Sequence, residues 1–213
     1  MTEKILSAST LAVFALTITV GFSSRAAETN GTTASAATTN SSSKTVTQKE
    51  VTIPGKGNLR LTFPKGWQIS ADQVKELGIP VQRFQFHPTD GAGFAILLEI
   101  IPVDMEKARG VNPHDALLRP GQMELVNSVE KELNIQDFQG EEATGSYFTL
   151  TDKKLANTAQ PPPGEYKYVT QGFAKLEDLI LNFRIVSNQP AGVEKTAALE
   201  MIKTACLSRP AKP

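Results

Sequence analysis

The chain has 213 residues, and 22 Lys and Arg residues balance 22 Asp and Glu residues. A net charge of zero argues against binding nucleic acid or an acidic membrane by electrostatic attraction, which needs a basic excess. The single cysteine excludes an intramolecular disulfide and a cysteine-based zinc cluster.

The N-terminus has the pattern of a secretory signal peptide. Lys4 precedes an uncharged, largely apolar stretch from Ile5 to Val20, and Ser24-Arg25-Ala26 then supplies small residues at a cleavage site. We therefore predict a signal peptide over residues 1–26 and a periplasmic or secreted protein without a membrane span after cleavage. An uncleaved membrane anchor is the alternative interpretation.

The rest of the chain divides by composition into a linker, one domain and a short tail. Residues 27–49 are rich in Ser and Thr and lack apolar periodicity, which predicts a disordered linker. Residues 50–207 have the length and apolar content of a single domain. Residues 208–213 are predicted to form a flexible tail.

The first half of the domain reads mainly as strands. Alternating or continuous apolar residues predict strands around Leu59–Phe63, around Phe84–Phe86 and over Phe94–Val103, the last two forming a hairpin around the loop 87–93. Ser70-Ala71-Asp72-Gln73 resembles a capping box and predicts a short helix that Gly78 ends.

The second half predicts a helix, three strands and a final helix. Asn112 and Pro113 are typical of an N-cap and first helical position, and Pro120-Gly121 should kink or restart the helix, which then continues through Leu133. The predicted strands and closing helix span residues 142–150, 165–175, 178–187 and 192–207.

Because hairpins dominate this order, the sequence predicts an α+β fold with a mostly antiparallel sheet flanked by helices. The segment Leu61-Thr62-Phe63-Pro64-Lys65-Gly66-Trp67, the hairpin over 166–187 and the closing helix resemble the PsbP-like and DcrB-like exported proteins. The resemblance implies an α/β/α sandwich. It also implies a binding or assembly role, because known members are mostly not catalytic.

Two histidines provide the candidate metal ligands. His87 and His114 each have a carboxylate nearby, in Asp90 and Asp115. If the hairpin loop and the helix start met in space, these four side chains could bind a divalent metal. The alternative is that His114 and Asp115 serve the helix start and His87 lies exposed at a strand end, with no cofactor bound.

Glu99 interrupts the most apolar predicted strand. A carboxylate on a central strand should be paired or lie at the rim of a cavity. Arg184 and Asn182 share a mixed face of a later strand, and we predict that Glu99 pairs with Arg184. The pair is either a structural ion pair, which we favour, or the polar part of a ligand cleft.

Of two further motifs, we interpret one as functional and the other as a coincidence. Pro161-Pro162-Pro163-Gly164 predicts an exposed, stiff loop, and this is the candidate contact loop. Ser128 and Lys131 match S-x-x-K, but the further motifs of a Ser–Lys enzyme are missing, so we interpret this match as coincidence.

The sequence leads to one favoured function and two alternatives. The favoured function is a non-enzymatic envelope protein that binds an unidentified envelope protein or assists assembly. One alternative is a small hydrolase that depends on a metal or on carboxylates. The other is a carrier of a small apolar ligand held in a closed pocket between sheet and helix.

Overall fold

The computed structural model describes residues 46–76, 79–89 and 93–209. The predicted signal peptide, residues 27–45 of the predicted linker and residues 210–213 of the predicted tail lie outside this part of the chain. The described residues form an α+β fold with two antiparallel sheets and three helices packed against them. The predicted fold class is therefore confirmed at this level.

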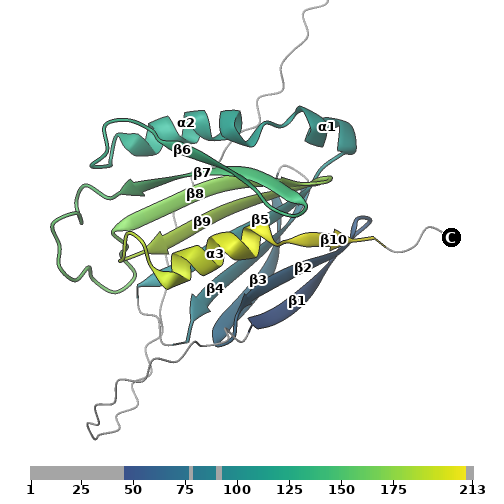
Figure 1. Cartoon of the computed structure of the whole chain (residues 1–213), viewed down its shortest axis with the longest axis horizontal. Helices are drawn as coiled ribbons and strands as arrows, with labels where there is room; N and C mark the ends of the chain where they lie inside the picture. Colours follow the sequence, from purple (N-terminus) through teal and green to yellow (C-terminus); the bar gives the residue numbers. More distant parts are fainter. Residues whose placement is uncertain (1–45, 77–78, 90–92, 210–213) are drawn as a thin grey trace, which may run out of the picture.

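The elements follow one another in an order dominated by hairpins (Figure 1). The strands of the first half are β1 (Val46–Ile53), β2 (Gly57–Pro64), β3 (Trp67–Glu76), β4 (Ile79–Pro88) and β5 (Phe94–Pro102). The helices are α1 (Met105–Gly110), α2 (Pro113–Leu125) and α3 (Val193–Lys203). The remaining strands are β6 (Ile135–Gln139), β7 (Ala143–Thr151), β8 (Tyr168–Leu176), β9 (Leu179–Ser187) and β10 (Cys206–Ser208).

The strands form a large sheet and a small one. The seven-stranded sheet has the order β3-β4-β5-β9-β8-β7-β6, and the three-stranded sheet has the order β1-β2-β10. The small sheet and α3 pack on one face of the large sheet, where they share its main apolar core. Helix α2 packs on the opposite face, over β7 and β8 (Figure 1).

Strand β9 shows how the sequence builds these layers. Successive side chains of a strand point to opposite faces of the sheet. Leu181 and Phe183 enter the main core, and Ile180 enters the smaller core beneath α2, where Leu117 also lies. The predicted apolar face of this strand is therefore confirmed. Its other face carries both polar and apolar side chains, and it faces α2.

Asp178 joins the two sheets at one end. It is 4% exposed and lies in the turn between β8 and β9. Lys56, from the turn between β1 and β2, contacts its carboxylate at 2.8 Å, and Arg209, which follows β10, contacts it at 3.2 Å. Ion pairs from two separate segments thus fasten the small sheet to the large one.

Two predictions for the first half were wrong. Strand β1 begins at Val46, inside the predicted linker, because it pairs along its whole length with β2. Residues 70–76 belong to β3 instead of starting a helix. The register from Trp67 opposite Pro88 to Glu76 opposite Ile79 shows that hairpin pairing with β4 overrides the local capping signal.

Boundaries in the second half also differed from prediction. The Asn112 cap and Pro113 at the helix start are confirmed, but α2 runs through Pro120 and ends at Leu125. Residues 135–139 then form β6. The closing helix ends at Lys203, because residues 206–208 pair with β2 as β10.

Candidate functional site

Glu99 lies within a polar network on the α2 side of the large sheet. It is 8% exposed. Arg83 of β4 donates to Glu99 Oε1 from Nε at 3.0 Å and from Nη2 at 2.8 Å, and Asn182 of β9 donates to Glu99 Oε2 at 2.7 Å. Both carboxylate oxygens therefore accept hydrogen bonds from neighbouring strands.

The predicted pairing of Glu99 with Arg184 is wrong. Strand register places Glu99 opposite Asn182, whereas Arg184 lies opposite Leu97, two residues away along the strand. Arg184 instead donates from Nη1 to Glu124 Oε1 of α2 at 2.7 Å. Asn182, which shares the mixed face with Arg184, is the residue of that strand that contacts Glu99.

These contacts support a structural use of the polar residues. The Arg83–Glu99–Asn182 contacts join β4, β5 and β9, and the Arg184–Glu124 pair joins β9 to α2. A buried carboxylate needs such partners to offset the loss of hydration. Glu99 thus fits the structural ion pair, with Arg83 in the place predicted for Arg184.

The structure does not bring the two histidines together. His87 lies on β4 and shares a hydrogen bond with Gln68 at 3.0 Å, whereas His114 lies in the first turn of α2 and contacts Asp137 of β6. Five strand spacings separate β4 from β6, or about 24 Å, which is too far for one metal ion. Asp90 lies outside the described residues. Within the described ranges, no group of three or more His, Cys, Asp or Glu side chains is placed to hold a metal.

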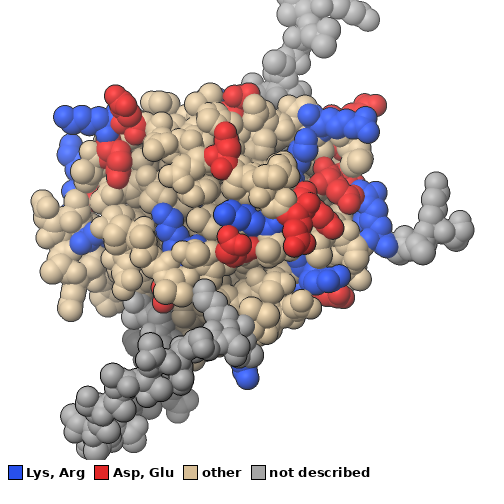
Figure 2. Space-filling model, viewed as in Figure 1, with Lys and Arg blue, Asp and Glu red and all other residues tan. Residues whose placement is uncertain are grey.

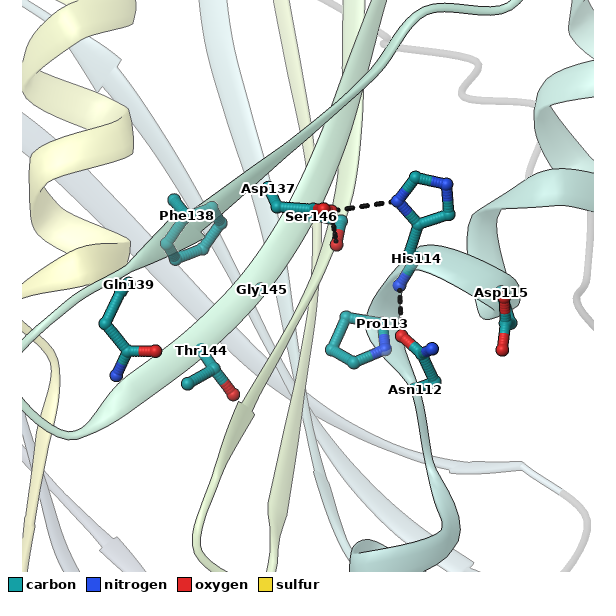
Figure 3. Close-up of a pocket in the computed structure, with 10 residues that line it drawn as sticks. All are labelled: Asn112, Pro113, His114, Asp115, Asp137, Phe138, Gln139, Thr144, Gly145 and Ser146. Carbon is teal, nitrogen blue, oxygen red and sulfur yellow. Dashed lines mark hydrogen bonds and ion pairs between the residues drawn. The ribbon is translucent and has the colours of Figure 1, made fainter.

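An open groove lies between the start of α2 and strands β6 and β7 (Figure 3). Its volume is about 390 Å³. His114 Nδ1 lies 2.9 Å from Asp137 Oδ1, and Ser146 donates from Oγ to the same carboxylate oxygen at 2.7 Å. The side chain of Asp115 points away from this cluster (Figure 3).

Although the cluster contains Ser, His and Asp, its arrangement is not that of a serine nucleophile. In a catalytic triad the histidine stands between the serine, whose proton it removes, and the aspartate. Here Asp137 stands in the middle, and Ser146 is only 3% exposed. The hydrogen bonds from Ser146 and His114 lower the pKa of the Asp137 carboxyl. The cluster therefore fastens α2 to β6 and β7.

Ser128, the serine of the S-x-x-K match, is held by the backbone. It lies after α2, in a segment that bridges to Asp152, instead of within a helix. The hydroxyl is within hydrogen-bonding distance of the carbonyl oxygens of Leu125 at 3.0 Å and Glu130 at 3.1 Å, and the residue is 9% exposed. These contacts favour the interpretation that the match is a coincidence.

The neighbouring Glu130 carries a pH dependence that can be tested. Burial raises its pKa, but hydrogen bonds from the Thr151 N–H at 2.9 Å and hydroxyl at 2.7 Å outweigh burial, so the net pKa is lowered. A lowered pKa in the folded state stabilises the protein above the unfolded value near 4.5. That contribution is lost as the pH falls through the folded pKa.

We expect Glu130→Gln to flatten the fall in stability below about pH 4.5. The decrease near neutral pH should stay below about 1 kcal/mol, because the carboxylate is only partly buried and its contacts are partly screened by solvent. Urea unfolding at several pH values would measure both effects. Glu132→Gln, at an exposed neighbour, is the matched control, and parallel pH curves for Glu130→Gln and the wild type would contradict the expectation.

Lys195 of α3 lies on the other side of the large sheet and is partly buried. Burial lowers the pKa of its ammonium group. Its Nζ donates to Thr149 Oγ1 at 2.9 Å and to the carbonyl of Pro190 at 3.4 Å. Since Thr149 also shares a hydrogen bond with buried Thr170, the lysine joins α3 to β7 and β8.

The loop 152–167, which contains the candidate contact loop Pro161–Gly164, protrudes between β7 and β8 (Figure 1). Its ends are closed by a hydrogen bond from the Asp152 N–H to the carbonyl of Lys167 at 2.8 Å. Pro162, Pro163 and Gly164 are exposed and Pro161 is partly buried. The prediction of an exposed loop is therefore confirmed for its tip.

The positions between the sheet and α2 are filled by side chains. Leu117, Phe148 and Phe173 are each less than 5% exposed and form the core there. Leu118, Met123 and Val126 are exposed on the outer side of the helix and just after it.

On the face drawn in Figure 2, acidic and basic side chains lie next to one another around the end of α3 and β10.

Sequence reasoning missed Arg83, Asp137 and Ser146. The core residues Phe84 and Phe86 indicate that Arg83 points to the opposite face of β4. Its contact with Glu99, however, depends on the register of the hairpin. Asp137 was missed because β6 was not predicted. Ser146 was missed for the same reason, because its partner Asp137 lies opposite it on that missing strand.

In the described part of the chain, no helix is both long and apolar enough to cross a membrane. No family model, curated protein or solved structure matches this chain.

Proposed function

We propose that the chain is an exported, non-enzymatic protein of the cell envelope that binds a partner protein, as an accessory or assembly factor. The signal-peptide pattern over residues 1–26 supports export. Packing of α2 on one face of the sheet, with α3 and a small sheet on the other, is compatible with a PsbP-like sandwich. The resemblance of residues 61–67 to that family supports a binding role.

The observation that carries the proposal is the loop 152–167. Loops held on a rigid scaffold are where proteins commonly place binding residues. This loop is long, its tip is exposed, and its base is tied to the sheet by several hydrogen bonds. An exposed segment that is already ordered loses little entropy on binding.

Native mass spectrometry of the full chain, expressed in its source cell and purified from the envelope fraction, tests this function. We expect a mass beginning near Ala27 and a complex with a second protein. A variant with residues 156–163 replaced by Gly and Ser should lose the complex, whereas Lys65→Ala, in another exposed turn, should keep it. A monomer that carries only a metal ion or a small molecule would instead favour an enzyme or a carrier.

A further inference from the structure

The backbone of the loop tip is fixed by its own residues. Proline locks φ near −65°, and a residue before proline is held in extended or polyproline II conformations. Gln160, Pro161 and Pro162 each precede a proline. The sequence therefore restricts Pro161 and Pro162 to the conformation that polyproline II helices use, whereas Gln160 is held only to the extended region.

A tight turn continues this conformation and ends it. The N–H of Glu165 donates to the carbonyl of Pro162 at 3.0 Å, and Gly164 has φ of 82°. These are the features of a type II turn, with proline at its second position and glycine at its third. The second position of that turn also has polyproline II angles, so Pro163 extends the run to three prolines.

The base of the loop holds this tip in place. Asn188, which follows β9, accepts from the Lys167 N–H at 2.9 Å and donates to the carbonyl of Glu165 at 3.4 Å. Asp152 accepts from the Lys154 N–H at 2.7 Å. Tyr166 is partly buried, and burial raises the pKa of its hydroxyl. The tip is thus a short, ordered projection from the sheet.

We propose that Pro161–Pro163 form a preformed polyproline II ligand that docks into a groove lined by Trp and Tyr side chains on the partner protein. The inference rests on the proposed function and names the chemistry of its contact. Aromatic grooves recognise such segments because pyrrolidine rings pack against the aromatic rings and the segment needs little further ordering. The exposure of Pro162 and Pro163 leaves these rings available.

Site-specific photo-crosslinking tests the contact without altering the prolines. The photoreactive amino acid p-benzoylphenylalanine is placed at exposed Gln160 of the full chain in source cells, with Lys65 as the control position. We expect a single protein adduct from position 160. Its crosslinked peptide should lie within a surface groove that contains at least two Trp or Tyr residues. An adduct on a surface without aromatic residues, or no adduct, would overturn the proposal.

Affinity then separates docking by the prolines from a role of the prolines in the stability of the chain. With the crosslinked partner purified, Pro162→Ala should raise the Kd of the mature chain at least tenfold, while its Tm stays unchanged. Gln160→Ala should change the Kd less than threefold. An unchanged Kd for Pro162→Ala, or a loss that follows a lowered Tm, would refute docking by the prolines.

The two experiments fail in different ways. If the envelope complex forms but crosslinks from Gln160 map to a non-aromatic surface, the proposed function holds and the polyproline contact is wrong. If native mass spectrometry finds no protein complex, the proposed function itself is wrong.

Discussion

Gly172→Ala is expected to lower the free energy of unfolding by about 3 kcal/mol, at the upper end of overpacking effects. Gly172 lies on β8, directly opposite Phe183 on β9. A Cβ atom at this position would lie 2.1 Å from Phe183 Cζ, and that ring is 1% exposed within the main core. The ring must therefore move into neighbours that are themselves close-packed.

Equilibrium unfolding in urea, followed by the fluorescence of the single tryptophan, would measure this effect. Gly110→Ala is the matched control, because nothing lies within 4 Å of a Cβ at that position. The double variant Gly172→Ala/Phe183→Leu should recover part of the lost stability, since the smaller side chain leaves room for the methyl group. Equal midpoints for Gly172→Ala and Gly110→Ala would contradict the close packing described here.

Sequence patterns predicted elements where the period of apolar residues was clear. The alternation that includes Leu181 and Phe183 predicted β9, and Asn112-Pro113 predicted the start of α2. The prediction failed for β3, where a capping-box pattern in residues 70–73 competes with long-range pairing to β4. A local sequence pattern contains no information about pairing with a strand that is distant in the sequence.

The candidate sites were harder to predict because they depend on register. A shift of two residues along β9 decides whether Asn182 or Arg184 faces Glu99, and no local pattern fixes that shift. The histidine pair failed for a topological reason, since strand order places β4 and β6 far apart. By contrast, the exposed tip at Pro162–Gly164 was predicted correctly, because prolines and glycine act on the local backbone alone.

Leu117→Ala should have an effect of similar size, about 3 to 4 kcal/mol, by loosening α2 from the sheet. Leu117 is fully buried in the smaller core, with Phe148, Phe173 and Ile180. Removing its three outer carbon atoms deprives these side chains of contacts and leaves a cavity that a well-packed core closes only in part. Urea unfolding would measure the change in stability.

Leu118→Ala is an unusually close control, because it makes the same chemical change one residue further along the same helix. Leu118 is 46% exposed on the outer side of α2, so the loss should stay below about 1 kcal/mol. If the buried face of α2 holds the helix on the sheet, Leu117→Ala should also speed hydrogen exchange of the α2 amides. Leu118→Ala should not. Equal destabilisation by the two substitutions would mean that α2 does not pack on the sheet through Leu117.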